Sequence, residues 1–138
     1  GVGWDRFVID QSGQISQRDF LNWSDLNSGT SDPIHIKTNL NGQLPIYRIE
    51  VEGFNYFTAE VINSDVGGFL YNGSILKETT NDYADGVEIS QYVSRDGYLV
   101  VKLDPGQFTT TIGFSVSAWV LAGGVDVSAT VIRQVYNL

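Results

Sequence analysis

The feature of this sequence that most constrains its fold is a strict two-residue alternation near the C-terminus. From Ile112 to Val120 every even-numbered residue is apolar. The residues between them are small or polar, apart from Trp119. Such alternation is typical of a β-strand with one buried face, because successive side chains point to opposite sides. The phase inverts after Gly123-Gly124, so that the odd-numbered residues from Val125 to Val131 are apolar.

This inversion predicts a long hairpin closed by the glycine pair, since a two-residue loop then places apolar side chains opposite one another. A second hairpin is expected at Asp96-Gly97, a dipeptide favoured in type I′ turns. It would join Val87–Ser94 to Tyr98–Leu103. The expected registers place Val120 opposite Val127, Ala118 opposite Ala129, Val116 opposite Val131, Val93 opposite Val100 and Tyr92 opposite Val101.

A third strand pair is predicted between Ile34–Thr38 and Ile46–Glu52. In the second of these segments Tyr47, Ile49 and Val51 alternate with Arg48, Glu50 and Glu52, which indicates one buried and one charged face. Phe54–Ile62 and Gly68–Tyr71 are also predicted strands. Seven or eight strands spaced by about ten residues are typical of a β-sandwich. We therefore predict an all-β fold, an antiparallel β-sandwich of jelly-roll type, over residues 33–138.

Residues 1–32 are predicted to form an extended N-terminal arm that leads into this sandwich. Phe7-Val8-Ile9-Asp10 and Ser12-Gly13-Gln14-Ile15 suggest a small strand, turn and strand. Gln17–Asn27 suits either one short helical turn or an extended segment. Its aromatic residues need a surface to cover, either on the same sandwich or on a neighbouring subunit.

Composition excludes several functions. The net charge of −8 argues against binding to nucleic acid. No apolar stretch is long enough to span a membrane. Without cysteine, and with His35 as the one histidine, most metal and acid–base sites are excluded, so we expect neither catalysis nor a cofactor. The absence of methionine suggests a piece of a longer protein.

The stretch Phe7-Val8-Ile9-Asp10-Gln11-Ser12-Gly13-Gln14-Ile15 resembles turns along the shafts of bacteriophage tail fibres and tailspikes. Ile34–Lys37 and Ile46–Tyr56 are similar to the openings of the receptor-binding heads at the tips of such fibres. The resemblance implies a β-sandwich, in some heads a jelly roll like tumour necrosis factor or C1q, assembled as a trimer. It also implies a place on the virion, or otherwise outside the cell, and a bacterial surface glycan or protein as partner. The heads share no ligand-contacting motif, so the resemblance assigns no binding residue.

Aromatic residues in expected loops are the candidate ligand-binding residues. A flat ring covers the apolar face of a sugar while neighbouring amides and carboxylates bind its hydroxyls. The alternative is that these rings cap the ends of the sandwich or pack between subunits. The predicted binding residues are Tyr71, Asn72, Asp82, Tyr83, Asp85, Tyr92 and Tyr98.

Three other groups contain residue types that suit a pH-sensitive contact, a glycosidase or a metal site. His35 is expected opposite Ile34 and Ile36, near Arg48, Glu50 or Glu52, as a pH-sensitive contact or simply a satisfied polar residue. The spacing of Glu50 and Glu52 suits a glycosidase pair, but a solvated sheet face explains it better. The acidic loop from Asn81 to Glu88 has oxygen ligands suited to Ca²⁺ without a known calcium-loop spacing.

The sequence thus favours a non-catalytic attachment domain whose trimer presents weak sites together. Apolar residues on both faces of the last strands (Trp119, Leu121 and Ile132) support an oligomer. The alternative is a structural module, such as a capsid or fibre cap or a trimerisation head. A polysaccharide-degrading enzyme is the third and weakest reading.

Overall fold

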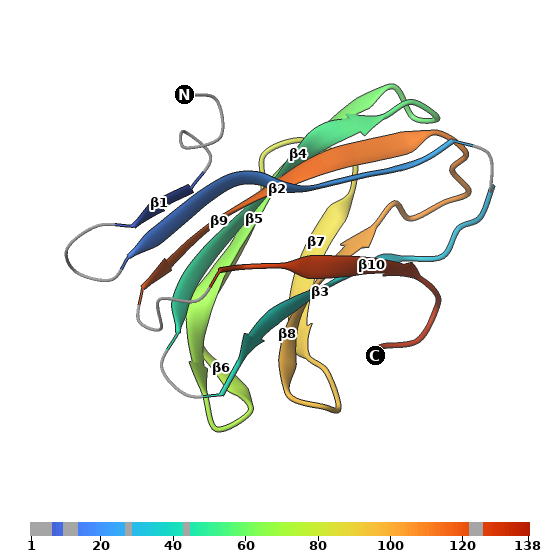
Figure 1. Ribbon diagram of the computed structural model, residues 1–138. Coiled ribbons are helices and arrows are strands. Elements are labelled where there is room, and N and C mark those ends of the chain that lie inside the picture. The colour runs from blue at the N-terminus through green and yellow to red at the C-terminus, as the bar shows by residue number, and fades with distance from the viewer. Residues whose placement is uncertain (1–6, 10–13, 27–28, 43–44, 122–125) are drawn as a thin grey trace.

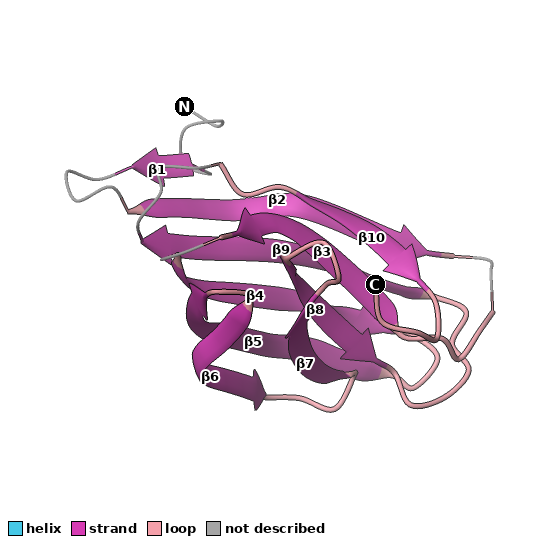
Figure 2. Ribbon diagram, turned by 90° about the horizontal axis from the view of Figure 1, so that it is seen from below, coloured by secondary structure: helices cyan, strands magenta, loops and turns pink. Residues whose placement is uncertain are grey.

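The chain forms two antiparallel β-sheets that pack face to face (Figure 1). The computed structural model describes residues 7–9, 14–26, 29–42, 45–121 and 126–138, and this part contains strands, turns and loops but no helix (Figure 2). The strands are β1 (Phe7–Ile9), β2 (Ile15–Asp25), β3 (Ile34–Asn41), β4 (Ile46–Asn55), β5 (Glu60–Tyr71), β6 (Ser74–Asp82), β7 (Glu88–Val93), β8 (Tyr98–Asp104), β9 (Ile112–Leu121) and β10 (Ala129–Arg133). One sheet has the order β1-β2-β9-β4-β5-β6 and the other β10-β3-β8-β7. The predicted all-β sandwich is confirmed.

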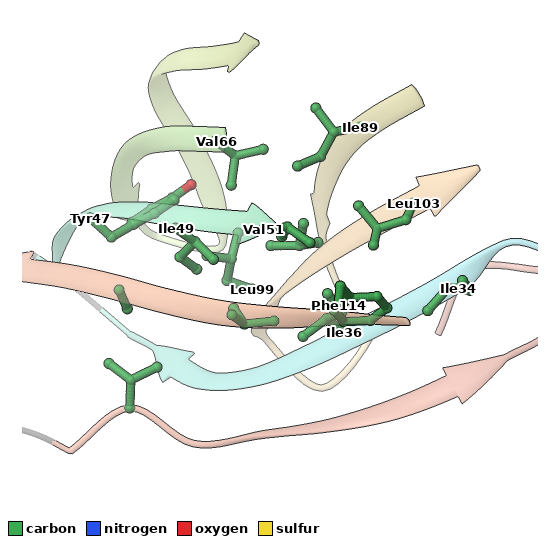
Figure 3. Close-up of a cluster of buried hydrophobic side chains, with 14 of the residues drawn as sticks. Ile34, Ile36, Tyr47, Ile49, Val51, Val66, Ile89, Leu99, Leu103 and Phe114 are labelled. Carbon is green, nitrogen blue, oxygen red and sulfur yellow. The ribbon is translucent and has the colours of Figure 1, made fainter. Parts of the chain in front are cut away.

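The core lies between the sheets and is made by the apolar phase of each alternating strand. Figure 3 shows its side chains converging from both layers. The six-stranded sheet contributes residues such as Ile49, Val51 and Val116, and the four-stranded sheet contributes Ile36 and Leu103, all without exposed surface. Burying each such side chain stabilises the fold by about 1.5–3 kcal/mol. The faces predicted for β4 and β9 from alternation are therefore confirmed.

The predicted hairpin between the last two strands is wrong, although its apolar phase is right. β9 lies between β2 and β4, whereas β10 pairs with β3 in the other sheet. The glycine pair itself is outside the described residues. Val116 and Val131 both face the core, from opposite sheets. A crossing between layers therefore buries the same residues as the predicted hairpin would have buried.

The third predicted pair is wrong for the same reason. β3 and β4 belong to different sheets, and β4 pairs with β5 and β9 instead. The predicted strand Phe54–Ile62 is also interrupted, because residues 56–59 turn the chain between β4 and β5. The Ala59 amide donates to the Tyr56 carbonyl in this turn, at 3.1 Å.

The hairpin at Asp96-Gly97 is confirmed, but its register differs by one residue. Tyr92 lies opposite Val100, and Val93 opposite Leu99. The loop has three residues rather than two, with Gly97 alone in the left-handed region at φ 93°. A three-residue loop that ends in a left-handed glycine is the next most common hairpin connection after the two-residue turns.

Sequence reasoning did not identify β6. The turn before it contains Asn72 (φ 50°) and Gly73 (φ 74°), the paired positive φ angles of a type I′ hairpin. Asn-Gly is the strongest short hairpin signal in a sequence, so the hairpin that contains β6 is predictable from the sequence. β6 forms the edge of the six-stranded sheet, and most of its side chains are exposed.

Two sequence predictions, the extended N-terminal arm and the jelly-roll connectivity of the strands, are not confirmed by the structure. β2 is an extended strand paired along β9 within the six-stranded sheet, so a free arm is not confirmed. The Trp23 ring packs on Phe114 of the same chain, at 5.4 Å between ring centroids. The jelly-roll connectivity is not confirmed either, because β4, β5 and β6 follow one another as neighbours in one sheet.

Candidate functional site

The outer face of the six-stranded sheet, which points away from the core, changes from apolar to polar along β4. Because Tyr47, Ile49 and Val51 are buried, the residues between them lie on this outer face. Strand pairing arranges the outer residues in rows that run across β9, β4, β5 and β6. The apolar row is Leu121, Ile46, Phe69 and Leu76; the middle row is Trp119, Arg48, Gly67 and Thr79; the polar row is Ser117, Glu50, Asp65 and Asn81.

A shallow groove of about 470 Å³ lies over β4, β5 and β6 where these rows meet. Gly67 supplies a floor without a side chain, and a Cβ there would lie 2.8 Å from the Thr79 hydroxyl oxygen. Phe69 and Ile46 line one end, and Tyr83, just after β6, lines the other. The groove therefore offers a ligand apolar and aromatic contacts beside hydrogen-bonding groups.

A hydrogen-bonded network centred on Asp65 forms the polar end of the groove. The Arg48 guanidinium donates to Asp65 Oδ2 at 2.9 Å and also contacts Glu50. The Asn81 amide donates to Asp65 Oδ1 at 2.9 Å. The Tyr83 hydroxyl lies near the same carboxylate and interacts with it electrostatically. Because Asp65 is buried and accepts hydrogen bonds from both Arg48 and Asn81, the network holds these two side chains in defined positions.

The electrostatics keep this network in one protonation state. Burial by itself opposes ionisation of Asp65, but the hydrogen bonds from Asn81 and Arg48, together with the nearby Tyr83 hydroxyl, outweigh it and hold the pKa of Asp65 below its ordinary value. The interaction with Asp65 also raises the pKa of Tyr83. At neutral pH the groove thus presents an ionised carboxylate, a cationic guanidinium and a neutral phenol.

Gln91 of the other sheet supports the groove floor from inside the sandwich. Its side-chain amide donates to the Gly67 carbonyl at 2.9 Å and to the Thr79 carbonyl at 3.2 Å. Its carbonyl accepts the Tyr47 hydroxyl at 2.7 Å. Burial raises the pKa of Tyr47, so this phenol remains a donor. These bonds fix β5 and β6 against β7 beneath the groove.

The structure places the predicted binding residues in three separate regions. Tyr71 and Asn72 lie at the β5–β6 turn, where the Tyr71 ring is 6.0 Å from Phe69. Asp82, Tyr83 and Asp85 lie at the opposite end of β6, and Tyr83 is the member of the set that lines the groove. Tyr92 and Tyr98 lie on the four-stranded sheet, where Lys37 Nζ is 5.3 Å from the centre of the Tyr98 ring.

Residues that sequence reasoning did not single out as ligand-binding make up most of the groove. The alternation along β4 predicts only a charged face for Arg48, and no pattern in the sequence marks Asp65. The Asn72-Gly73 turn was the available signal, because a hairpin there brings β5 and β6 together. The missed lining residues are Ile46, Tyr47, Arg48, Asp65, Gly67, Gly68, Phe69, Lys77, Thr79 and Asn81.

His35 is a buried, satisfied polar residue and does not lie beside Glu50 or Glu52. Its Nδ1 lies 2.7 Å from the Tyr92 hydroxyl, and its Nε2 lies 3.0 Å from the Gln134 carbonyl. The expected proximity to the glutamates is wrong because β3 and β4 are in different sheets. Burial is the largest influence on the ring and lowers the pKa of His35.

The acidic loop after β6 does not form a metal site among the described residues. The Asp82 carboxylate accepts the Ser64 hydroxyl and the Ile89 amide, so it joins the two sheets. No three acidic or histidine side chains in the described ranges are arranged to hold a metal ion. The residues that the structure describes also contain no helix long and apolar enough to cross a membrane.

Comparisons with protein-family models, with curated proteins and with solved structures find no match to this chain. The interpretation of its function therefore depends on the physical properties of the groove and on the sequence patterns described above.

Proposed function

We propose that this chain is a non-catalytic attachment domain, the receptor-binding head of a bacteriophage tail fibre, and that the groove over β4, β5 and β6 binds a host-surface saccharide. The observation that carries the proposal is the apolar row lying directly beside the Asp65 network. A sugar ring has an apolar C–H face and an equatorial set of hydroxyls, and such a surface satisfies both.

The residues in the groove are suited to binding rather than to bond cleavage. Asp65 is held ionised by its donors, which opposes a role as a general acid at neutral pH. Glu50 contacts Arg48, and Glu52 lies on the exposed face. A shallow groove gives modest affinity at each site, and a trimer would multiply that affinity by presenting three grooves at once.

A glycan array probed with the purified 138-residue chain tests this proposal. We expect saturable binding to a subset of glycans, and Tyr83→Ala should weaken it at least about fivefold, since it removes the ring that would stack on the sugar or bind its hydroxyls. Tyr136→Ala is the matched control, because Tyr136 is highly exposed in the C-terminal segment. Absence of binding to any glycan, or equal effects of the two variants, would contradict the proposal.

A structural module is the second candidate, and an aromatic cluster at the other end of β4 favours it. Phe54, Tyr56, Phe57 and Phe108 are exposed there, with the Phe57 and Phe108 rings 5.7 Å apart. Exposed apolar patches of this kind often mark protein interfaces. Light scattering distinguishes the cases: a trimer that also binds glycans supports the attachment head, a trimer without glycan binding supports the structural module, and a monomer at micromolar concentration contradicts the fibre-tip proposal.

A further inference from the structure

We propose that the saccharide bound in the groove is acidic and that Lys77 pairs with its carboxylate or sulfate. This inference rests on the proposed function of the groove and names the chemical class of its ligand. It is carried by the position of Lys77, by its backbone conformation and by the charges around it.

Lys77 is a cation that lines the groove and forms no ion pair with a described carboxylate. It lies on β6 between Leu76, which pairs with Phe69, and Thr79, which pairs with Gly67, and its side chain is exposed. Among the described cations, ion pairs are formed by Lys37 with Asp96, by Arg133 with Asp25 and by Arg48, the other cation of the groove, with Glu50 and Asp65. The Lys77 ammonium is therefore available to a ligand in the groove.

An irregularity in the pairing of β6 with β5 affects the direction in which the Lys77 side chain points. Leu76 lies opposite Phe69, but Thr79 lies opposite Gly67, so Lys77 and Glu78 together face Gly68. This is a β-bulge, and Lys77 adopts a φ of 55°, which an L-residue takes only at a cost. Bulges re-aim side chains and are frequent beside binding sites. The bulge itself accounts for this left-handed conformation, as it does for Asp19 at the bulge of β2.

The two cations that line the groove differ in what surrounds them. Arg48 pairs with both Asp65 and Glu50, so its charge is already balanced, whereas Lys77 has no such partner among the described residues. The complete chain carries a net charge of −8. An acidic saccharide is repelled by most of this protein, so the groove is a favourable place for it to bind.

The test uses a glycan array that carries each acidic glycan beside its neutral counterpart, with carboxyl groups methyl-esterified or sulfates removed. The native chain should bind acidic glycans about tenfold more tightly than these counterparts, the factor expected for one charge-assisted hydrogen bond. Lys77→Gln should abolish this preference without abolishing binding to the neutral forms. Lys77→Arg should retain it, because the positive charge remains.

Lys102→Gln is the matched control, since it removes the same charge from the four-stranded sheet and should leave the preference unchanged. Equal binding of acidic and neutral glycans by the native chain would overturn the inference and leave the proposed function intact. A preference that survives in Lys77→Gln would show that another residue recognises the anion, and would overturn the role of Lys77. Absence of binding to all glycans would refute the proposed function, and the inference with it.

Discussion

Arg133 should be among the most important polar side chains for the stability of this fold. Its side chain, on β10, is 9% exposed, and its guanidinium lies 2.7 Å from the Asp25 carboxylate, which is 10% exposed. It also donates to the backbone carbonyls of Asp32 and Thr30, each at 3.0 Å, and to the Thr109 hydroxyl. One side chain thus joins the last strand of the four-stranded sheet to the end of β2 and to the segment before β9.

The substitution Arg133→Met removes the charge and every one of these donors while keeping a long apolar side chain. Asp25 is then left as a buried carboxylate without its cation. Breaking a buried ion pair from one side costs about 3–5 kcal/mol in the free energy of unfolding. Since a domain of this kind has about 5–15 kcal/mol in total, the loss is large. It corresponds to a fall in Tm of about 10–20 °C.

Urea-induced unfolding, followed by tryptophan fluorescence, measures this loss. Lys37→Met is the matched control, because Lys37 and Asp96 form an ion pair of similar length, 2.6 Å, at an exposed position. That pair should contribute much less, because water screens the attraction between exposed charges. If Arg133→Met loses no more stability than Lys37→Met, then burial does not determine how much each ion pair contributes to the free energy of unfolding, and the reasoning fails.

Three further predictions concern the groove support, the groove itself and the buried histidine. Tyr47→Phe leaves the Gln91 carbonyl without its donor and should lower the free energy of unfolding by about 1–3 kcal/mol in urea titrations; an unchanged midpoint would contradict the bond. Gly67→Val fills the groove floor and should weaken glycan binding at least about tenfold by calorimetry, whereas undiminished affinity would place the ligand elsewhere. Because burial lowers the pKa of His35 in the folded chain, protonation favours unfolding. Stability should therefore fall as the pH drops below 6.5, and His35→Gln, which cannot titrate, should show a smaller fall in this range.

Local patterns identified several strands, though not β6, and gave the buried face where the alternation is regular. The alternation of Tyr47, Ile49 and Val51 with charged residues gave the correct inner face of β4, and the even positions of β9 gave its inner face. These inner faces can be predicted without knowing which strands pair, because alternation follows from the geometry of a single extended chain.

The sequence by itself thus determined that this chain builds strands with one apolar face, and hence a layered all-β structure. Apart from hairpins marked by turn dipeptides, such as the one at Asp96-Gly97, only the tertiary structure decided which strands pair, because a side chain is buried equally well in a hairpin or in a crossing to the opposite layer. The tertiary structure also determined which residues meet in the groove, because the bulge at Lys77 shifts the β5–β6 register so that Asn81 lies opposite Asp65. That register depends on contacts such as those of Gln91, which come from the other sheet and leave no periodic signal in β5 or β6.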